Sequence, residues 1–144
     1  INRFLDIIKP KFLFLGMKDF QQLMLIKSHL KKHNIKTKLI PCSTIREKNG
    51  TAISSRNSKL KKYQMKNAGK IYKFIKNNKK AILHKILNKK KVDVINELIK
   101  LGADRVDYIE CIDLIKKEVC NNGKYKFNIF IAYYMGDVRL IDNL

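Results

Sequence analysis

The sequence contains few cysteines, few acidic residues, few arginines and no long apolar run. No apolar stretch approaches the roughly 18–20 residues that span a bilayer, and the longest, residues 129–135, is typical of a buried strand. The three cysteines, Cys42, Cys111 and Cys120, lack CxxC spacing, and their odd number argues against a secreted disulfide framework. Residues 1–20 show no signal-peptide pattern. We therefore expect a cytoplasmic protein with reduced thiols and no membrane segment.

The scarcity of acidic residues gives the chain a formal net charge of +20, from 32 basic and 12 acidic residues. Clustered basic side chains bind nucleic-acid phosphates, so a small basic RNA-binding domain in residues 58–144 is one alternative. Only 5 of the 32 basic residues are arginines, whose planar fork makes the bidentate contacts of dedicated phosphate and base readers. The lysines are scattered among asparagine and isoleucine. We interpret the charge as a lysine-rich surface and expect no specific nucleic-acid partner.

The first third of the sequence predicts a strand–helix–strand unit. Residues 12–15 are a continuous apolar run ending at Gly16, as in a central parallel strand buried on both faces. Apolar residues then recur at helical spacing over residues 19–33, and Asn34 is suited to end that helix. Alternation over residues 36–41 predicts a second strand, so the three elements form a right-handed βαβ unit by default.

A polar loop, residues 43–57, separates this unit from a segment of different character. Loops of this length without secondary structure are usually functional or disordered. The rest of the sequence predicts three helices, at residues 60–75, 81–87 and 92–101, followed by three strands, at residues 106–112, 127–134 and 138–141. We place the domain boundary after residue 57, which gives domains 1–57 and 58–144.

The first candidate site is the polar block at residues 16–22. Gly16 ends a predicted parallel strand, where open α/β sheets bind ligands, and a glycine lets the backbone approach a ligand closely. Lys18 lies at the start of the next predicted helix, a position that suits a phosphate or a negative charge developing on one. Gln22 offers a donor and an acceptor, which suit a hydroxy acid. Asp19 could take part in the site or only cap the helix.

The second candidate site is Ser54-Ser55-Arg56 in the glycine-containing loop. Two hydroxyls, backbone N–H groups and a fixed cation together bind phosphate well. The alternative is an ordinary turn with an arginine salt bridge. His29 and His33 could share one helix face, but no third ligand is in view, so we predict no metal site.

Together these blocks resemble those of the pantothenate synthetase (pantoate–β-alanine ligase) family. That family carries Gly-x-Lys-Asp-x-Gln-Gln and Ser-Ser-Arg-Asn blocks at this separation, here at residues 16–22 and 54–57. Arg46-Glu47 and Gly50 between them also match, although Met17 stands where the family usually has an acidic residue. The ending Arg-Leu-Ile-Asp-Asn, residues 139–143, is similar to the family's C-terminus. The resemblance runs from Phe4 to Asn143 and corresponds to the second half of the family's sequence.

The resemblance implies an α/β fold: the C-terminal part of a Rossmann-like nucleotidyltransferase domain, followed by a small α+β domain with a short antiparallel sheet. The implied activity is ATP-dependent ligation of pantoate and β-alanine to pantothenate, an AMP-forming reaction through a pantoyl adenylate. Magnesium accompanies the ATP, and the complete enzyme is expected to be a homodimer.

The resemblance also implies roles for single residues. Lys18 is the expected main charge stabiliser, Gln22 is expected to hold pantoate, and Ile45 to contact the nucleotide through its backbone. The loop at the second block is expected to close over the phosphates. The residues implied to bind ATP are Gly16, Met17, Lys18, Asp19, Ile45, Ile53, Ser54, Ser55 and Arg56.

The family's His-x-Gly-His block and its first pantoate-binding glutamine do not occur in these 144 residues. A βαβ piece cannot cover its own sheet. We therefore expect the chain alone to be inactive, or only weakly folded over residues 1–57. Full activity is expected to need the absent segment in cis or as a partner chain. A truncated remnant without turnover stays open as an alternative.

Overall fold

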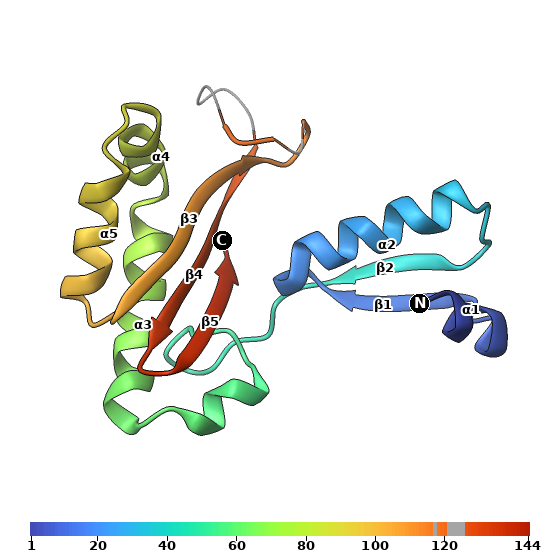
Figure 1. Cartoon of the computed structure of the whole chain (residues 1–144), viewed down its shortest axis with the longest axis horizontal. Helices are drawn as coiled ribbons and strands as arrows, with labels where there is room; N and C mark the ends of the chain where they lie inside the picture. The colour runs from blue at the N-terminus through green and yellow to red at the C-terminus, as the bar shows by residue number, and fades with distance from the viewer. Residues whose placement is uncertain (117, 121–125) are drawn as a thin grey trace. The chain divides into compact units, whose positions relative to one another are not determined.

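The structure is a computed structural model that describes residues 1–116, 118–120 and 126–144 (Figure 1). The chain divides into two compact units, Ile1–Thr44 and Ile45–Leu144, and each is described by itself. None of the helices in the described ranges combines the length and the apolar character needed to cross a bilayer.

The first unit is the expected strand–helix–strand unit, preceded by a short helix. Its elements are α1 (Asn2–Ile8), β1 (Phe12–Gly16), the 3-10 turn η1 (Met17–Asp19), α2 (Phe20–Lys32) and β2 (Lys38–Cys42). β1 and β2 pair in parallel, with Leu13 opposite Leu39 and Leu15 opposite Pro41. Figure 1 shows α2 lying along this two-stranded sheet.

Helix α2 ends one residue earlier than expected from the sequence, since its C-cap is His33 and Asn34 is the residue after the cap. This residue takes a left-handed φ of 52°, which asparagine tolerates better than most residues. The Asn34 and Ile35 N–H groups donate to the carbonyls of Lys31 and Leu30, at 3.3 and 2.9 Å. These two bonds satisfy carbonyls that the helix end would otherwise leave unpaired.

Only one face of the β1–β2 sheet is covered by described residues of the first unit. Ile26 and Leu30 of α2 are buried and pack against Leu13 and Leu39. On the opposite face, the Phe14 side chain is 65% exposed. The expectation that β1 is buried on both faces is therefore wrong for this structure, because within this unit α2 supplies a layer on one side only.

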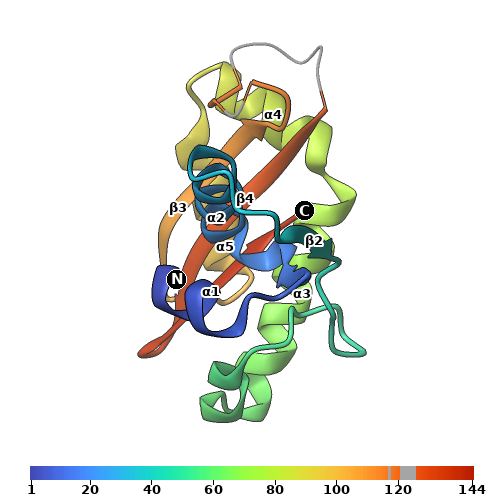
Figure 2. The same ribbon diagram turned by 90° about the vertical axis from the view of Figure 1, so that its right-hand side faces the viewer.

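The second unit is an antiparallel sheet covered by helices. It contains η2 (Ser55–Lys59), α3 (Lys62–Asn77), α4 (Lys79–Leu87), α5 (Lys91–Lys100), β3 (Arg105–Asp113), β4 (Phe127–Met135) and β5 (Val138–Asn143). The strand order is β3-β4-β5, with both pairs antiparallel. Helix α3 runs alongside β4, as both views show (Figures 1 and 2).

The larger core lies between this sheet and its helices. Alternate residues of β4, including Ile129 and Ile131, are fully buried against Ile71 and Ile75 of α3 and Leu98 of α5. The period of 2 in the strand and the period of 3.6 in the helices place these side chains on facing surfaces. Each such side chain contributes about 1.5–3 kcal/mol when removed from water, so this core dominates the stability of the unit.

The division between the two units lies earlier in the sequence than the predicted domain boundary. The observed division falls between Thr44 and Ile45, whereas the change in composition predicted it after residue 57. The loop up to that residue packs within the second unit, since Arg46 bonds to Asp142 and Asn49 bonds to the carbonyl of Met65 in α3. Composition could not reveal these contacts.

Candidate functional site

The carboxyl end of β1 is open at Gly16. This residue has φ −67° and ψ 134°, values that any residue adopts. A Cβ added at Gly16 would meet no atom within 4 Å. Neither strain nor packing among the described residues therefore requires glycine at this strand end, and the space beside the Gly16 backbone is open among these residues.

The rest of the first block forms the turn between β1 and α2. Met17 and Lys18 are half-buried, whereas Asp19 and Gln22 are exposed. Asp19 occupies the N-cap position of α2, but its side chain makes no capping hydrogen bond, so the structure does not support the helix-cap interpretation. The structure brings these residues together at the N-terminal end of α2, where unsatisfied backbone N–H groups favour an anion.

The second block begins with a short hairpin at residues 45–53. Arg46 pairs with Ala52 in an antiparallel bridge. The Ile53 N–H donates to the Ile45 carbonyl at 3.0 Å, so the backbone of Ile45 already takes part in the hairpin. The Ile45 side chain is 74% exposed. The loop that composition suggested to be functional or disordered is therefore an ordered turn in its first half.

Gly50 makes the tip of this hairpin possible. Its φ of 96° lies in a region that L side chains rarely adopt. A Cβ added to it would lie 2.1 Å from Cδ1 of the Tyr72 ring. Across the tip, the Glu47 N–H donates to the Thr51 carbonyl at 2.8 Å. Conformation and packing both require glycine here, in contrast with the strand end of the first unit.

Arg46 ties the hairpin to the last strand. Its Nη1 and Nη2 donate to the two carboxylate oxygens of Asp142 at 2.6 and 3.0 Å. The guanidinium carbon lies 4.5 Å from the centroid of the Tyr72 ring. Burial lowers the Arg46 pKa, but the hydrogen bond to Asp142 and the Asp142 charge raise it, and the net shift is upward. The contact is therefore an ion pair with a permanently charged guanidinium.

The residues expected to contact phosphate follow the hairpin directly. Ile53, Ser55 and Arg56 are exposed, and Ser54 is half-buried at the start of η2. The Ser54 hydroxyl accepts a hydrogen bond from the Arg56 N–H at 3.2 Å. Asn57 is buried, and its Nδ2 donates to a hairpin carbonyl at 3.1 Å. The ion pairs of the described residues do not include Arg56, so the interpretation as a turn with an arginine salt bridge is not supported.

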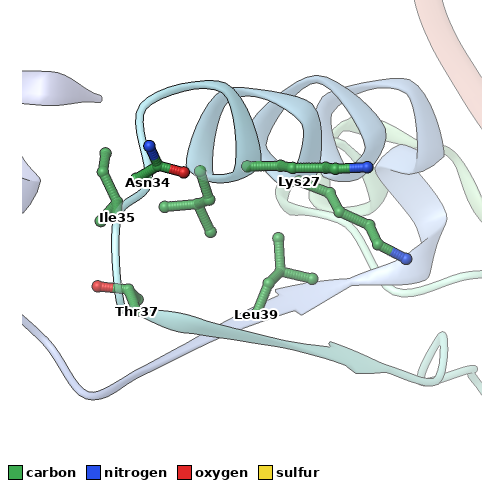
Figure 3. Close-up of a pocket in the computed structure, with 7 residues that line it drawn as sticks. Lys27, Asn34, Ile35, Thr37 and Leu39 are labelled. Carbon is green, nitrogen blue, oxygen red and sulfur yellow. The ribbon is translucent and has the colours of Figure 1, made fainter.

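A surface pocket of the first unit is not lined by any residue of the first block. It has a volume of about 450 Å³ and is lined mainly by the C-terminal half of α2 and the connection from α2 to β2 (Figure 3). Its polar side chains are those of Lys27, Lys31, Asn34 and Thr37, and its apolar side chains include Ile35 and Leu39. The pocket faces the amino end of β2. Since open α/β sheets bind ligands beyond the carboxyl ends of their strands, we do not assign it to the site.

Two of the residues that position the second block were not identified as such from the sequence. From the sequence, Asp142 was expected by default to be part of a C-terminal structural anchor, with no partner named, and Tyr72 was one unremarked residue of the helix predicted over residues 60–75. Asn49 also escaped notice, although its side chain donates to the Met65 carbonyl and accepts from the Thr51 N–H, at 2.8 and 3.0 Å. Arg46 and Asp142 are 96 residues apart, and no local pattern signals a contact over that separation.

The fold defines the class of the protein. A parallel βαβ unit with polar residues at the carboxyl end of its first strand is followed by a helix-covered antiparallel sheet, as expected for an α/β ligand-binding protein. The chain belongs to the pantoate–β-alanine ligase family, whose model, described as "Pantoate-beta-alanine ligase", matches residues 1–144.

Curated relatives agree with this membership. The pantothenate synthetase of Azobacteroides pseudotrichonymphae is 37% identical over an aligned length of 146 residues, and the alignment covers 100% of this chain and 52% of the relative. That of Endomicrobium trichonymphae is 39% identical over 131 residues, which cover 91% of this chain and 46% of the relative. The chain thus spans about half the length of the curated relatives it matches, consistent with the C-terminal half expected from its motifs.

Solved structures agree with the fold. A Francisella tularensis pantoate–β-alanine ligase, described as complexed with "Beta-gamma ATP" and β-alanine, is 36% identical and matches with a TM-score of 0.71 over 99% of this chain and 46% of its own. A Thermus thermophilus structure of the same family, 22% identical, matches with a TM-score of 0.81 over 99% of this chain and 52% of its own. The expected fold class is confirmed by these matches.

Proposed function

We propose that this chain serves the ATP-dependent ligation of pantoate and β-alanine to pantothenate. The observation that carries the proposal is the open strand end at Gly16 with Lys18 beside it, in a chain whose full length matches the family model. The ligands described for the Francisella tularensis relative, an ATP species and β-alanine, support the same substrates. The complete enzyme is proposed to be a cytoplasmic homodimer that takes ATP with its magnesium.

The reaction proceeds in two steps. A carboxylate oxygen of pantoate attacks the α-phosphorus of ATP, the bond to the β-phosphate oxygen breaks, and pyrophosphate leaves. The amine of β-alanine then attacks the carbonyl carbon of the pantoyl adenylate, the bond to the phosphate oxygen of AMP breaks, and the amine loses a proton. Both steps depend on positioning and charge neutralisation, so no side-chain nucleophile is needed.

The first block is assigned to the reacting groups. Gly16, Met17, Lys18 and Asp19 line the ATP site, and Lys18 stabilises the negative charge that develops on the α-phosphate. Gln22 donates to and accepts from pantoate. The exposed position of Gln22 and the half-buried position of Lys18 beside the open strand end support these roles.

The second block is assigned to the nucleotide and its phosphates. Ile45 contacts the nucleotide through its backbone. Ile53, Ser54, Ser55 and Arg56 close over the phosphates and exclude water from an adenylate that would otherwise hydrolyse. The exposure of Ser55 and Arg56 supports their contact with a ligand.

The RNA-binding alternative loses support in the second unit. Arg139 donates to Asp107 through Nε and Nη2 at 3.0 and 2.8 Å, and Arg46 is bound to Asp142. Two of the few residues capable of bidentate phosphate contacts are thus paired within the protein. We do not pursue that function further.

Replacement of Lys18 tests the proposal. In the native polypeptide that contains these residues, Lys18→Ala is expected to lower pantoate-dependent pyrophosphate release by about 10²–10³-fold, the range for loss of one preorganised charge stabiliser. Lys27→Ala, an exposed lysine later on α2, is the matched control and should leave the rate within about twofold. A near-normal rate for folded Lys18→Ala would remove the assignment of Lys18.

A further inference from the structure

We infer that Arg46, Asp142 and Tyr72 form a positioning device that holds the hairpin and thereby aims the segment Ile53–Arg56 at its ligand. The phosphate role of that segment rests on the function proposed above. The anchoring of the hairpin rests on the contacts of the second unit alone. No residue of the device is assigned to the reacting atoms, so all three are positioning residues.

The ion pair joins two parts of the chain that are far apart in sequence. Arg46 makes both hydrogen bonds to the Asp142 carboxylate, a bidentate geometry that fixes orientation as well as distance. The same guanidinium donates to the Gly50 carbonyl at 3.1 Å and to the Asn143 carbonyl at 3.3 Å. One side chain therefore connects the tip of the hairpin, its first strand and the end of β5.

The pair is shielded from water. The side chains of Arg46 and Asp142 are only 21% and 10% exposed. The Tyr72 ring of α3 lies against the guanidinium, and Gly50 lies against the same ring. Low exposure and an aromatic face strengthen an ion pair compared with a fully solvated one. Removing one partner also leaves the other charge partly buried without compensation.

Hydrogen bonds of the hairpin also hold the residues that follow it, Ile53–Arg56. The Arg46–Ala52 bridge and the bond from the Ile53 N–H to the Ile45 carbonyl join its two strands. The Asn57 side chain returns to the Ala52 carbonyl, which fixes the residues in between from both ends. Strand β5, which carries Asp142, also lies beside η2. A shift of Arg46 therefore moves both ends of the proposed phosphate segment.

The second unit offers a matched control for this pair. Arg139 also lies on β5 and also donates two hydrogen bonds to a carboxylate, that of Asp107. This pair is more exposed, at 39% and 42%, and it joins β5 to β3 rather than to the hairpin. Asp107→Asn thus removes a comparable pair from the same strand and leaves the hairpin contacts intact.

Hydrogen exchange of the native polypeptide tests the anchoring. Asp142→Asn is expected to accelerate exchange of the Glu47 and Ile53 amides by roughly 10- to 100-fold, the range for loss of a charge-assisted hydrogen bond. Asp107→Asn should leave both amides unchanged. Unchanged hairpin amides in folded Asp142→Asn would overturn the inference. If that variant does not fold, Arg46→Lys, which keeps the charge but loses the fork and the stacking, must give the same acceleration.

Kinetics of the same variants test the link to the phosphates. At a temperature where all variants are folded, Asp142→Asn should lower kcat for pantoate-dependent pyrophosphate release by about 10–100-fold, because small misplacements of positioning groups are costly. Asp142→Glu, which restores the charge, should recover part of the loss, and Asp107→Asn should react at the unmodified rate. A loosened hairpin with an unchanged rate would overturn the phosphate role. An inactive unmodified protein would overturn the proposed function, while exchange would still decide the anchoring.

Discussion

The substitution Gly50→Ala should destabilise the second unit far more than its size suggests. Gly50 has φ 96°, where an alanine costs about 1–2 kcal/mol. Its new Cβ would lie 2.1 Å from the Tyr72 ring, so the ring must move. That movement breaks the stacking of Arg46 on Tyr72, worth about 0.5–2 kcal/mol. The total expected loss is about 1.5–4 kcal/mol of unfolding free energy, before any strain in α3 is counted.

Urea unfolding followed by circular dichroism measures this loss. Gly16→Ala is the matched control, since its φ is ordinary and its added Cβ meets nothing within 4 Å. It should change stability by no more than about 0.5 kcal/mol, or raise it slightly by restricting the unfolded chain. In a Tyr72→Ala background, Gly50→Ala should cost only the backbone term of about 1–2 kcal/mol. Equal stabilities of the two glycine variants would refute the reasoning.

Two further predictions concern the core of the second unit. Ile131→Ala should lower the unfolding free energy by about 2–5 kcal/mol in the same urea assay, because Ile131 is fully buried; a loss below about 1 kcal/mol would contradict the packing described. Burial, with smaller contributions from Cys120 and Glu110, raises the pKa of Cys111 to about 12 from a usual value of 9.0. The unfolded thiol ionises first as pH rises, so the contribution of Cys111 to stability should be constant below pH 9 and fall between pH 9 and 12 by about 1.4 kcal/mol per pH unit. Cys111→Ala should remove that part of the slope in pH-dependent urea titrations, and an unchanged slope would rule out the assignment to Cys111.

Most of the secondary structure could be predicted from the sequence. The helix expected over residues 60–75 is α3, Lys62–Asn77, and the strand expected over residues 127–134 is β4, Phe127–Met135. These elements carry long periodic patterns, with Ile71 and Ile75 one turn apart and alternate residues of β4 facing the same core. The predictions from these patterns are confirmed because the packing partner of each element lies within the same unit.

Burial could not be predicted where the pattern allowed two outcomes. The apolar run of β1 is typical of a strand buried on both faces, yet Phe12 and Phe14 are 44% and 65% exposed. A run of apolar residues shows that both faces of a strand could be buried. Whether each face is buried depends on whether another part of the structure packs against it. The domain boundary differs for another reason: composition placed it after residue 57, whereas tertiary contacts of Arg46 and Asn49 place the preceding loop in the second unit.

The candidate site was predicted from its motifs, whereas the residues that hold its second block in place were not. Gly16 and Lys18 stood out because their residue types suit a strand end and a helix start. The roles of Asp142 and Tyr72 follow from tertiary contacts to Arg46. A side chain whose function is to hold another side chain leaves no local signal in one sequence.

The central claim is that these residues serve the activation of pantoate by ATP. Its most direct test is the pantoate-dependent exchange of labelled pyrophosphate into ATP, without β-alanine, by the native polypeptide that contains these 144 residues. Reversible formation of a pantoyl adenylate predicts exchange that requires pantoate and is lost in Lys18→Ala. Absence of exchange in the folded native polypeptide, with ATP, magnesium and pantoate all present, would contradict the claim.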